Sequence, residues 1–198
     1  MFFYRLLATL SRPLARVLFR PRVQGLEHVP AEGGFLLCAN HLSGFDAFAL
    51  GYALYPCVLR NMGKPQLFER PLLGPLVTSL GAFPARRGTG EDGAVAAAAR
   101  LAQAGEAVVV FPEGARRRKD RVHKPRSGAA RAALAAGMPV VPAAIRGTDR
   151  WRRLGRWEIT VGPPVSLDDL RALEPSRAAR EGTRRTWDAI VALEGFPR

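Results

Sequence analysis

The sequence predicts an α/β fold: one domain with a central, mostly parallel sheet flanked by helices. Short apolar runs with the length of buried strands alternate along the chain with segments of helical character. Polar turn residues follow several of these runs, as they do where strands leave a sheet. With 198 residues, 47% of them hydrophobic, the chain is long enough for one sizeable core. We divide it into an amphipathic helix over residues 1–22 and a domain over residues 23–198.

The first twenty residues, MFFYRLLATLSRPLARVLFR, contain no acid and predict an amphipathic helix. At 100° per residue the apolar side chains gather on one side and four arginines on the other. The segment is too charged for a membrane span and lacks the ordered regions of a signal peptide. We expect a peripheral helix on the phospholipid surface, at the cytoplasmic face of the cell membrane. The alternative is a helix packed on the domain's own core.

The segment FLLCANHLSGFD, residues 35–46, holds the first candidates for chemistry. Its charge-free apolar run predicts a buried strand, and the helical character of the residues after it places His41 at a strand-to-helix turn. Asp46, five residues later, is close enough to fold back onto His41. An imidazole held by a carboxylate through one nitrogen is a good general base at the other. Taken alone, such a pair is more often a turn histidine followed by an acid that begins a helix.

Strand and helix signals continue to alternate after this segment. An alanine-rich stretch with two acids at its start, residues 91–104, predicts a helix that ends at Gly105. The apolar segment 67–80 contains prolines and a glycine and is expected to be irregular. The other expected strands are 57–62, 107–111, 138–145 and 156–165, with a short one in 23–30; the other expected helices are 129–137 and 178–193, with a capped helix start at 166–169.

The charge of the chain indicates an anionic partner. Lysine and arginine number 30 against 17 acids, a net charge of +13. No nucleic-acid-binding motif accompanies this charge, so we expect no nucleic acid partner. The densest basic run, residues 116–126, is either a solvated loop or a site for phosphates or a bilayer surface. Cys38 and Cys57 lie in apolar segments and are expected to be free, buried thiols, since their spacing suits neither a disulfide framework nor a metal site.

Four sequence blocks occur in a defined order. N-H-x-S-x-x-D at residues 40–46 is followed by GAFPARR at 81–87, FPEGAR at 111–116 and VPAAI at 141–145. This set resembles the glycerolipid acyltransferase family, the lysophosphatidic acid acyltransferases and their relatives. The chain departs from the family pattern at Ala115, where the family usually has Thr or Ser, and at Gln66 and Arg86, where it often has an acid.

The resemblance implies a reaction and roles for the residues of the blocks. The reaction is direct transfer of a fatty acyl chain from the thioester of acyl-CoA or acyl-carrier protein to the free hydroxyl of 1-acyl-glycerol-3-phosphate, a lysophospholipid, giving phosphatidic acid. No cofactor is expected beyond that co-substrate, and no metal. Backbone amides at the turn are expected to stabilise the oxyanion. The implied residues are His41 and Asp46 as catalytic, Arg87, Glu113, Gly114 and Arg116 as substrate-binding, and Asn40, Ser43 and Arg86 as supporting.

Some of these roles have a physical reason of their own. A guanidinium grips a phosphate with two parallel hydrogen bonds, which favours Arg87 and Arg116 as phosphate ligands, with Arg86 in competition with Arg87. Glu113 can accept a hydrogen bond from a glycerol hydroxyl or position a cation. Gly114 lets the backbone approach a ligand closely.

Several alternatives stay open. Ser43 suggests a Ser-His-Asp hydrolase with a covalent acyl intermediate, but it lacks the G-x-S-x-G elbow, so we interpret it as a turn residue. A second alternative is an acyltransferase whose acceptor is another lysolipid or glycerol 3-phosphate. In a third alternative the protein is not an enzyme but a basic protein that binds membranes or nucleic acid. The segment 67–80 either lines a groove for an acyl chain or covers the core.

Overall fold

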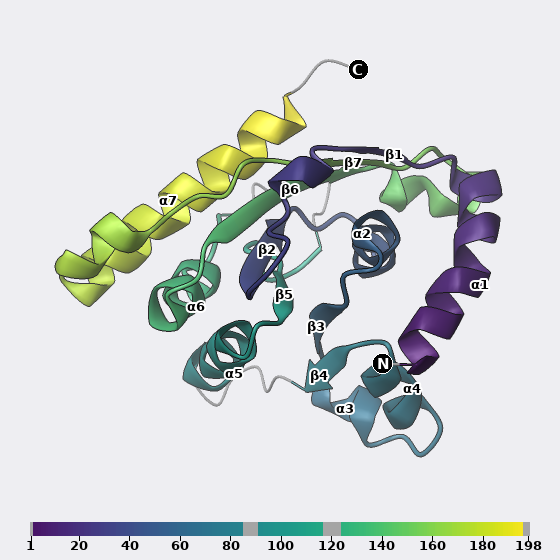
Figure 1. Ribbon diagram of the computed structural model, residues 1–198, viewed down its shortest axis with the longest axis horizontal. Helices are drawn as coiled ribbons and strands as arrows, with labels where there is room; N and C mark the ends of the chain where they lie inside the picture. The colour runs from purple at the N-terminus through teal and green to yellow at the C-terminus, as the bar shows by residue number, and fades with distance from the viewer. Residues whose placement is uncertain (1, 85–90, 117–123, 196–198) are drawn as a thin grey trace.

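Within the residues that the computed structural model describes, 2–84, 91–116 and 124–195, seven strands form one sheet in the order β1-β7-β6-β2-β5-β3-β4 (Figure 1). Neighbouring strands are parallel except β6 and β7, which run antiparallel. The predicted α/β fold with a mostly parallel sheet is therefore confirmed. The strands are β1 Arg22–Gln24, β2 Phe35–Ala39, β3 Leu59–Gly63, β4 Ala82–Pro84, β5 Ala107–Val110, β6 Val140–Arg146 and β7 Glu158–Val161.

Helices cover both faces of this sheet (Figure 1). One face is covered by α5 (Glu91–Gln103), α6 (Gly128–Ala136) and α7 (Pro175–Glu194), and the other by α1 (Phe2–Phe19) and α2 (Asp46–Leu54). Shorter helices connect the strands. They are α3 Pro65–Phe68, α4 Leu73–Ser79 and the 3-10 helices η1 Leu26–His28, η2 Thr148–Arg153 and η3 Asp168–Ala172.

Alternate residues of β2 belong to two separate apolar cores. Leu36 and Cys38 pack with alanines of α5 and α6, whereas Phe35, Leu37 and Ala39 pack with residues of α1 and α2. All five residues of the strand are buried. A strand covered on both faces has no position for a polar side chain, which explains the charge-free run in the sequence.

Three predicted elements differ from those observed. The segment 67–80 is less irregular than expected, because it contains the whole of α4 and the end of α3. The expected helix start at 166–169 leads only into the 3-10 helix η3, where Ser166 Oγ accepts from the amide of Asp168. The last helix, expected at 178–193, begins at Pro175, because the Glu174 side chain caps it by accepting from the amides of Ser176 and Arg177.

Helix α1 buries one face and exposes another. Its Tyr4, Ala15 and Phe19 are buried, and the Phe19 ring stacks on the fully buried Trp157 with centroids 4.0 Å apart. The alternative of a helix packed on the domain core therefore holds for this face. Among the described residues nothing covers a second apolar face, which we call the α1 stripe. The α1 stripe consists of Phe3, Leu6, Leu10, Leu14 and Val17.

One arginine of α1 packs against neighbouring residues, a contact that the sequence did not predict. Arg12 turns toward α2, where its Nη1 donates to the carbonyl oxygen of Tyr52 and its guanidinium lies over the rings of Tyr52 and Tyr55, at 4.6 and 4.9 Å. A guanidinium gains from stacking on aromatic faces, a term that a helical projection does not include. No helix among the described residues has both the length and the apolarity needed to cross a bilayer.

Both cysteines are free thiols, as predicted. Cys38 is fully buried in β2, and burial raises the pKa of its thiol to about 12. Cys57 is only partly buried, and its pKa is also raised by burial. Neither thiol is therefore a reactive thiolate at neutral pH.

Candidate active site

The candidate site lies at one edge of the sheet, after three neighbouring strands. β2 has β5 on one side and β6 on the other, and all three are parallel. Their carboxyl ends therefore meet at the same edge, which is where α/β proteins place binding sites. The segments that leave this edge are residues 40–46 after β2, 111–116 after β5 and 147–148 after β6.

His41 and Asp46 form the hydrogen-bonded pair that their spacing suggested. His41 Nδ1 is 2.7 Å from Asp46 Oδ2. The carboxylate also accepts from two backbone amides, so it acts as an acceptor and the proton of this bond belongs on Nδ1. In that tautomer Nε2 carries the lone pair. The His41 side chain is 20% exposed, so a substrate can reach it.

The carboxylate of Asp46 is fully buried and accepts four hydrogen bonds. Oδ2 accepts from the ring of His41 and from the amides of Leu42 and Ser43, at 2.7, 2.7 and 2.8 Å. Oδ1 accepts from the hydroxyl of Thr148 at 2.5 Å. Both oxygens of the carboxylate are therefore held by hydrogen-bond donors, which fix its orientation. The turn of residues 41–46, hereafter the catalytic turn, is folded around this carboxylate.

Asn40 and Ser43 make hydrogen bonds that hold the catalytic turn. Asn40, which is buried, donates from Nδ2 to the carbonyl of Ile145 at 2.9 Å and accepts at Oδ1 from the amide of Ile145 at 2.7 Å. These two hydrogen bonds continue the connection between β2 and β6 by one residue beyond Ala39, the last paired residue of β2. Ser43 Oγ accepts from the amide of Phe45 at 3.0 Å. Both side chains thus belong to the hydrogen bonding of the turn, and their supporting roles in the reaction stay predictions.

The FPEGAR block meets the catalytic turn through two of its side chains. Glu113 is 3% exposed, and its Oε1 accepts from the amide of His41 at 3.1 Å. The ring of Phe111 stacks on the ring of His41 with centroids 4.1 Å apart and an angle of 15° between planes. Glu113 therefore has a structural contact that sequence reasoning did not foresee, and Phe111, to which no role was assigned, fixes one face of the imidazole.

Gly114 and Arg116 complete the described part of this block. Gly114 has φ +70°, and a Cβ on it would lie 2.9 Å from Cδ and Nε of Arg126. Arg126 donates its amide to the carbonyl of Pro112 at 2.8 Å, so the end of the basic run returns to this turn. The exposed Arg116 reaches the catalytic turn, because a Cβ on Gly44 would lie 4.0 Å from its Nη1.

Two of the predicted site residues lie outside the described residues. Arg86 and Arg87 belong to the segment 85–90, so their roles as phosphate ligands stay predictions. The same holds for residues 117–123, the larger part of the basic run. The described residues contain no group of three or more His, Cys, Asp or Glu side chains placed to hold a metal ion.

The backbone amides of the catalytic turn are less available than the sequence suggested. The amides of His41, Leu42 and Ser43 donate to carboxylates, that of Phe45 to Ser43 Oγ and that of Asp46 to the Ser43 carbonyl. Within the described part of the chain, the amide of Gly44 is the one in this turn without an internal hydrogen bond. The general expectation of several amide donors is therefore too broad, because folding the turn around two carboxylates uses most of them.

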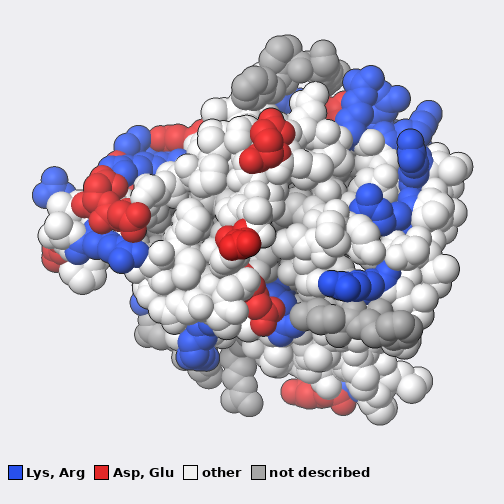
Figure 2. Space-filling view, in the orientation of Figure 1, with Lys and Arg blue, Asp and Glu red and all other residues white. Residues whose placement is uncertain are grey.

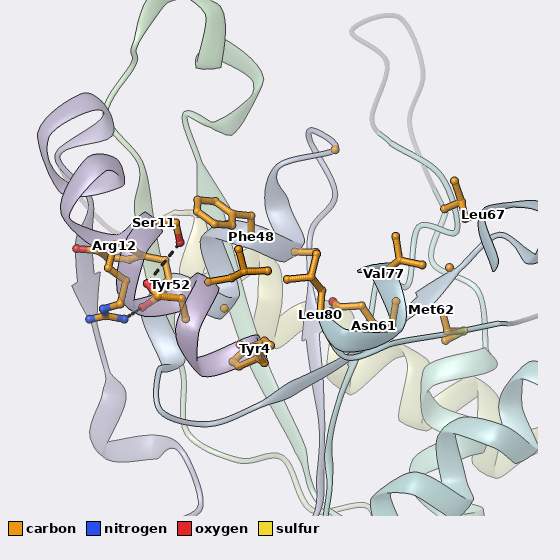
Figure 3. Close-up of a pocket in the computed structure, with 17 residues that line it drawn as sticks. Tyr4, Ser11, Arg12, Phe48, Tyr52, Asn61, Met62, Leu67, Val77 and Leu80 are labelled. Carbon is orange, nitrogen blue, oxygen red and sulfur yellow. Dashed lines mark hydrogen bonds between the residues drawn. The ribbon is translucent and has the colours of Figure 1, made fainter. Parts of the chain in front are cut away.

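An apolar cavity of about 410 Å³ adjoins the catalytic turn (Figure 3). It is lined by residues of α1 and α2 on one side and of β3 and α4 on the other, and Gly44 of the catalytic turn belongs to its wall. Leu67, Val77 and Leu80 also line it. Of the two interpretations of segment 67–80, the one in which it lines a groove therefore agrees with the structure.

Comparison with known proteins agrees with this geometry. The sequence model of a family described as acyltransferase matches residues 20–146. The chain belongs to the acyltransferase family. The matched segment runs from the end of α1 to the end of β6 and contains both the catalytic turn and the FPEGAR block. The family resemblance inferred from the four blocks is thereby confirmed, and with it the class of enzyme.

Individual relatives are similar over most of the chain. The 1-acyl-sn-glycerol-3-phosphate acyltransferase of Bacillus subtilis is 28% identical over 176 residues, which cover 87% of each chain. An uncharacterized protein of Mycobacterium leprae is 33% identical over 156 residues, 70% of this chain and 40% of that protein. The crystal structure of the 1-acyl-sn-glycerophosphate acyltransferase of Thermotoga maritima has a TM-score of 0.73, with 98% of this chain and 83% of that chain covered. Its identity of 19% makes it evidence for the acyltransferase fold alone.

The position of Gly114 gives a first prediction for this acyltransferase. Gly114→Ala and Gly105→Ala both place a Cβ at a positive φ, +70° and +85°, so each should lower the stability by about 1 kcal/mol. Only the Cβ at Gly114 meets a neighbour, Arg126, whereas Gly105 has nothing within 4 Å. We therefore expect Gly114→Ala to lose about tenfold or more in acyl-transfer rate through displaced side chains, and Gly105→Ala to keep it. Equal rates in the two variants, measured beside their melting temperatures, would contradict this.

Proposed function

We propose that the protein transfers a fatty acyl chain from the thioester of acyl-CoA or acyl-carrier protein to the free hydroxyl of 1-acyl-glycerol-3-phosphate, giving phosphatidic acid for phospholipid synthesis. The observation that carries the proposal is the hydrogen bond between His41 and Asp46. It leaves the lone pair of His41 Nε2 available at the edge of the sheet, beside an apolar cavity. Membership of the acyltransferase family and the similarity to the B. subtilis enzyme of that name support it.

In the proposed mechanism His41 Nε2 takes the proton of the acceptor hydroxyl while the hydroxyl oxygen attacks the carbonyl carbon of the thioester. The carbon–sulfur bond then breaks, and the imidazolium returns the proton to the departing thiolate. The carboxylate of Asp46 stabilises the imidazolium in between. We assign the oxyanion to the amide of Gly44, because the neighbouring amides of the turn are used internally.

Arginines and a glutamate are proposed to hold the glycerol phosphate. Arg116 lies near Gly44 and presents an exposed guanidinium suited to a phosphate. Arg87, with Arg86 beside it, stays the second proposed ligand on the basis of its sequence block. Glu113 is proposed to act mainly by holding His41, since its carboxylate accepts a hydrogen bond from the backbone amide of His41. Its predicted contact with a glycerol hydroxyl remains part of the proposal. These groups would orient the acceptor hydroxyl toward Nε2.

The cavity beside the catalytic turn is proposed to hold the acyl chain. Its walls come from apolar helices, and its volume of about 410 Å³ lies in the range of small-molecule sites. Gly51 of α2 lines it, and a Cβ at this position would lie 3.2 Å from the Tyr4 hydroxyl of α1. A larger side chain at Gly51 would therefore shorten the space available to a chain.

The surface of α1 is proposed to place the enzyme on the cytoplasmic face of the cell membrane as a peripheral protein. The α1 stripe leaves five large or branched apolar side chains exposed on one helix face, and Arg5 and Arg16 of the same helix and Arg20 just after it are exposed as well. Figure 2 shows basic side chains gathered on the side of the molecule where α1 lies, whereas acidic and basic side chains are mixed at α7. Apolar residues flanked by arginines suit an anionic bilayer surface.

A second prediction tests the base. His41→Gln should lower the rate of transfer from acyl-CoA to lysophosphatidate by at least about 1000-fold, because general base catalysis and its orientation are lost together. His28→Gln is the matched control, since His28 lies in η1 and contacts the carbonyl of Val161. It should keep the rate. Substantial transfer by His41→Gln would refute the assignment of the base.

The acceptor is tested in the same assay. Transfer to glycerol 3-phosphate or to another lysolipid, with none to lysophosphatidate, would move the proposal to the alternative acceptor. Absence of transfer with every acceptor and with both thioester donors would overturn the proposed reaction.

A third prediction concerns the acyl cavity. Gly51→Leu should lower the rate with long-chain acyl-CoA about tenfold relative to a medium-chain acyl-CoA, because its side chain enters space that a long chain needs. Gly93→Leu on α5, where a Cβ would meet nothing within 4 Å, is the control and should leave the chain-length profile unchanged. Identical profiles for Gly51→Leu and the wild type would exclude the cavity as the chain site.

A fourth prediction concerns the membrane. Leu14→Glu should weaken binding to phosphatidylglycerol vesicles about tenfold in a flotation assay, since it removes one exposed leucine that the bilayer would bury and adds a negative charge. Val191→Glu on α7 makes a similar change at another exposed apolar residue and should have little effect. Equal binding of both variants would show that the α1 stripe does not face the bilayer.

A further inference from the structure

Thr148 is a buried polar residue that none of the four sequence blocks includes. It follows Arg146, the last residue of β6, and Gly147, and it begins η2. Its side chain has no exposed surface, and its hydroxyl donates to Asp46 Oδ1 at 2.5 Å, across 102 residues of sequence. We infer that Thr148 is a positioning residue for the catalytic pair: its hydroxyl sets the rotation of the Asp46 carboxylate and so holds His41 in the tautomer of a base. The inference rests on the proposed function of that pair.

The argument begins with the two oxygens of Asp46. Oδ2 has three donors, the His41 ring and two amides, whereas Oδ1 has Thr148 as its donor among the described residues. Asp46 has no exposed surface, so water does not replace a lost donor without a rearrangement. Without the hydroxyl, the carboxylate would rotate to share its remaining donors between both oxygens. Such a rotation moves Oδ2 away from Nδ1, and the imidazole loses the bond that selects its tautomer.

The backbone around Thr148 is built to present this hydroxyl. Gly147 has φ +81°, and a Cβ on it would lie 2.0 Å from the carbonyl oxygen of Arg156, so the turn requires glycine. Three residues before Thr148, Ile145 bonds both polar atoms of the Asn40 side chain. Residues at the end of β6 and just after it therefore form hydrogen bonds with the segment after β2 at two residues, Asn40 and Asp46. Because the backbone on both sides of Thr148 is fixed, the position of its hydroxyl fixes the orientation of the Asp46 carboxylate.

Two substitutions separate the hydroxyl from the packing of the side chain. Thr148→Val keeps the shape and removes the donor, and Thr148→Ser keeps the donor and removes a methyl group. Thr186→Val is the matched control: Thr186 is also a buried threonine, 2% exposed on α7, and its hydroxyl has no hydrogen-bond partner among the described residues.

The kinetic measurement is kcat and KM for transfer from acyl-CoA to lysophosphatidate. Thr148→Val should lower kcat about 10- to 100-fold, as loss of partners that orient a functional histidine does at metal sites, with both KM values changed less than about twofold. Thr148→Ser should stay within about threefold of the wild type, and Thr186→Val should equal it. A kcat for Thr148→Val within about twofold of wild type, or equal losses in the Val and Ser variants, would overturn the inference.

A second measurement needs no substrate and keeps the inference separate from the proposed reaction. The chain has three histidines, so ¹⁵N-histidine spectra can be assigned with His28→Gln and His41→Gln. Neutral His41 should be in the Nδ1–H tautomer in the wild type and in Thr148→Ser, and in a mixture of tautomers in Thr148→Val. An unchanged tautomer in Thr148→Val would refute the positioning role. Absence of acyl transfer together with the expected spectra would refute the proposed reaction and leave the positioning role standing.

Discussion

The Asp46 carboxylate has been removed from water, and the catalytic turn is organised around supplying it with donors. An ionised carboxylate in apolar surroundings is costly unless it is hydrogen-bonded. Two backbone amides, an imidazole and the Thr148 hydroxyl provide those bonds. Because they come from the segments after β2 and β6, one buried charge fixes the relative position of two parts of the chain. The orientation of His41 is a consequence of that arrangement.

The parallel order of β5, β2 and β6 makes these contacts possible. Each strand delivers its following residues to the same edge of the sheet, so blocks that are distant in sequence become neighbours. The motif residues then hold one another: Glu113 accepts from the amide of His41, Phe111 stacks on its ring, and Asn40 joins Ile145. Several residues of an enzyme motif are thus needed to build the site before any substrate is present.

The sequence predicted what depends on local pattern and failed where tertiary contacts decide. The α/β class, the strand before His41 and the His41–Asp46 pair follow from apolar runs and short spacing. Thr148 was not found, because one threonine after a strand has no pattern that distinguishes it. The contact of Arg12 was not predicted, because a helical projection does not include the rings of Tyr52 in α2 and Tyr55 just after it.

Helix α1 takes part in two surfaces at once. Its Tyr4, Leu7 and Ala8 line the apolar cavity, while the α1 stripe lies on another face of the same helix. A lipid tail bound in the cavity of a bilayer-docked molecule would then enter sideways from the leaflet, without passing through bulk solvent. Turnover in that geometry follows the mole fraction of acceptor within the leaflet. Adding inert lipid at constant total acceptor would slow the enzyme, the surface dilution typical of interfacial catalysts.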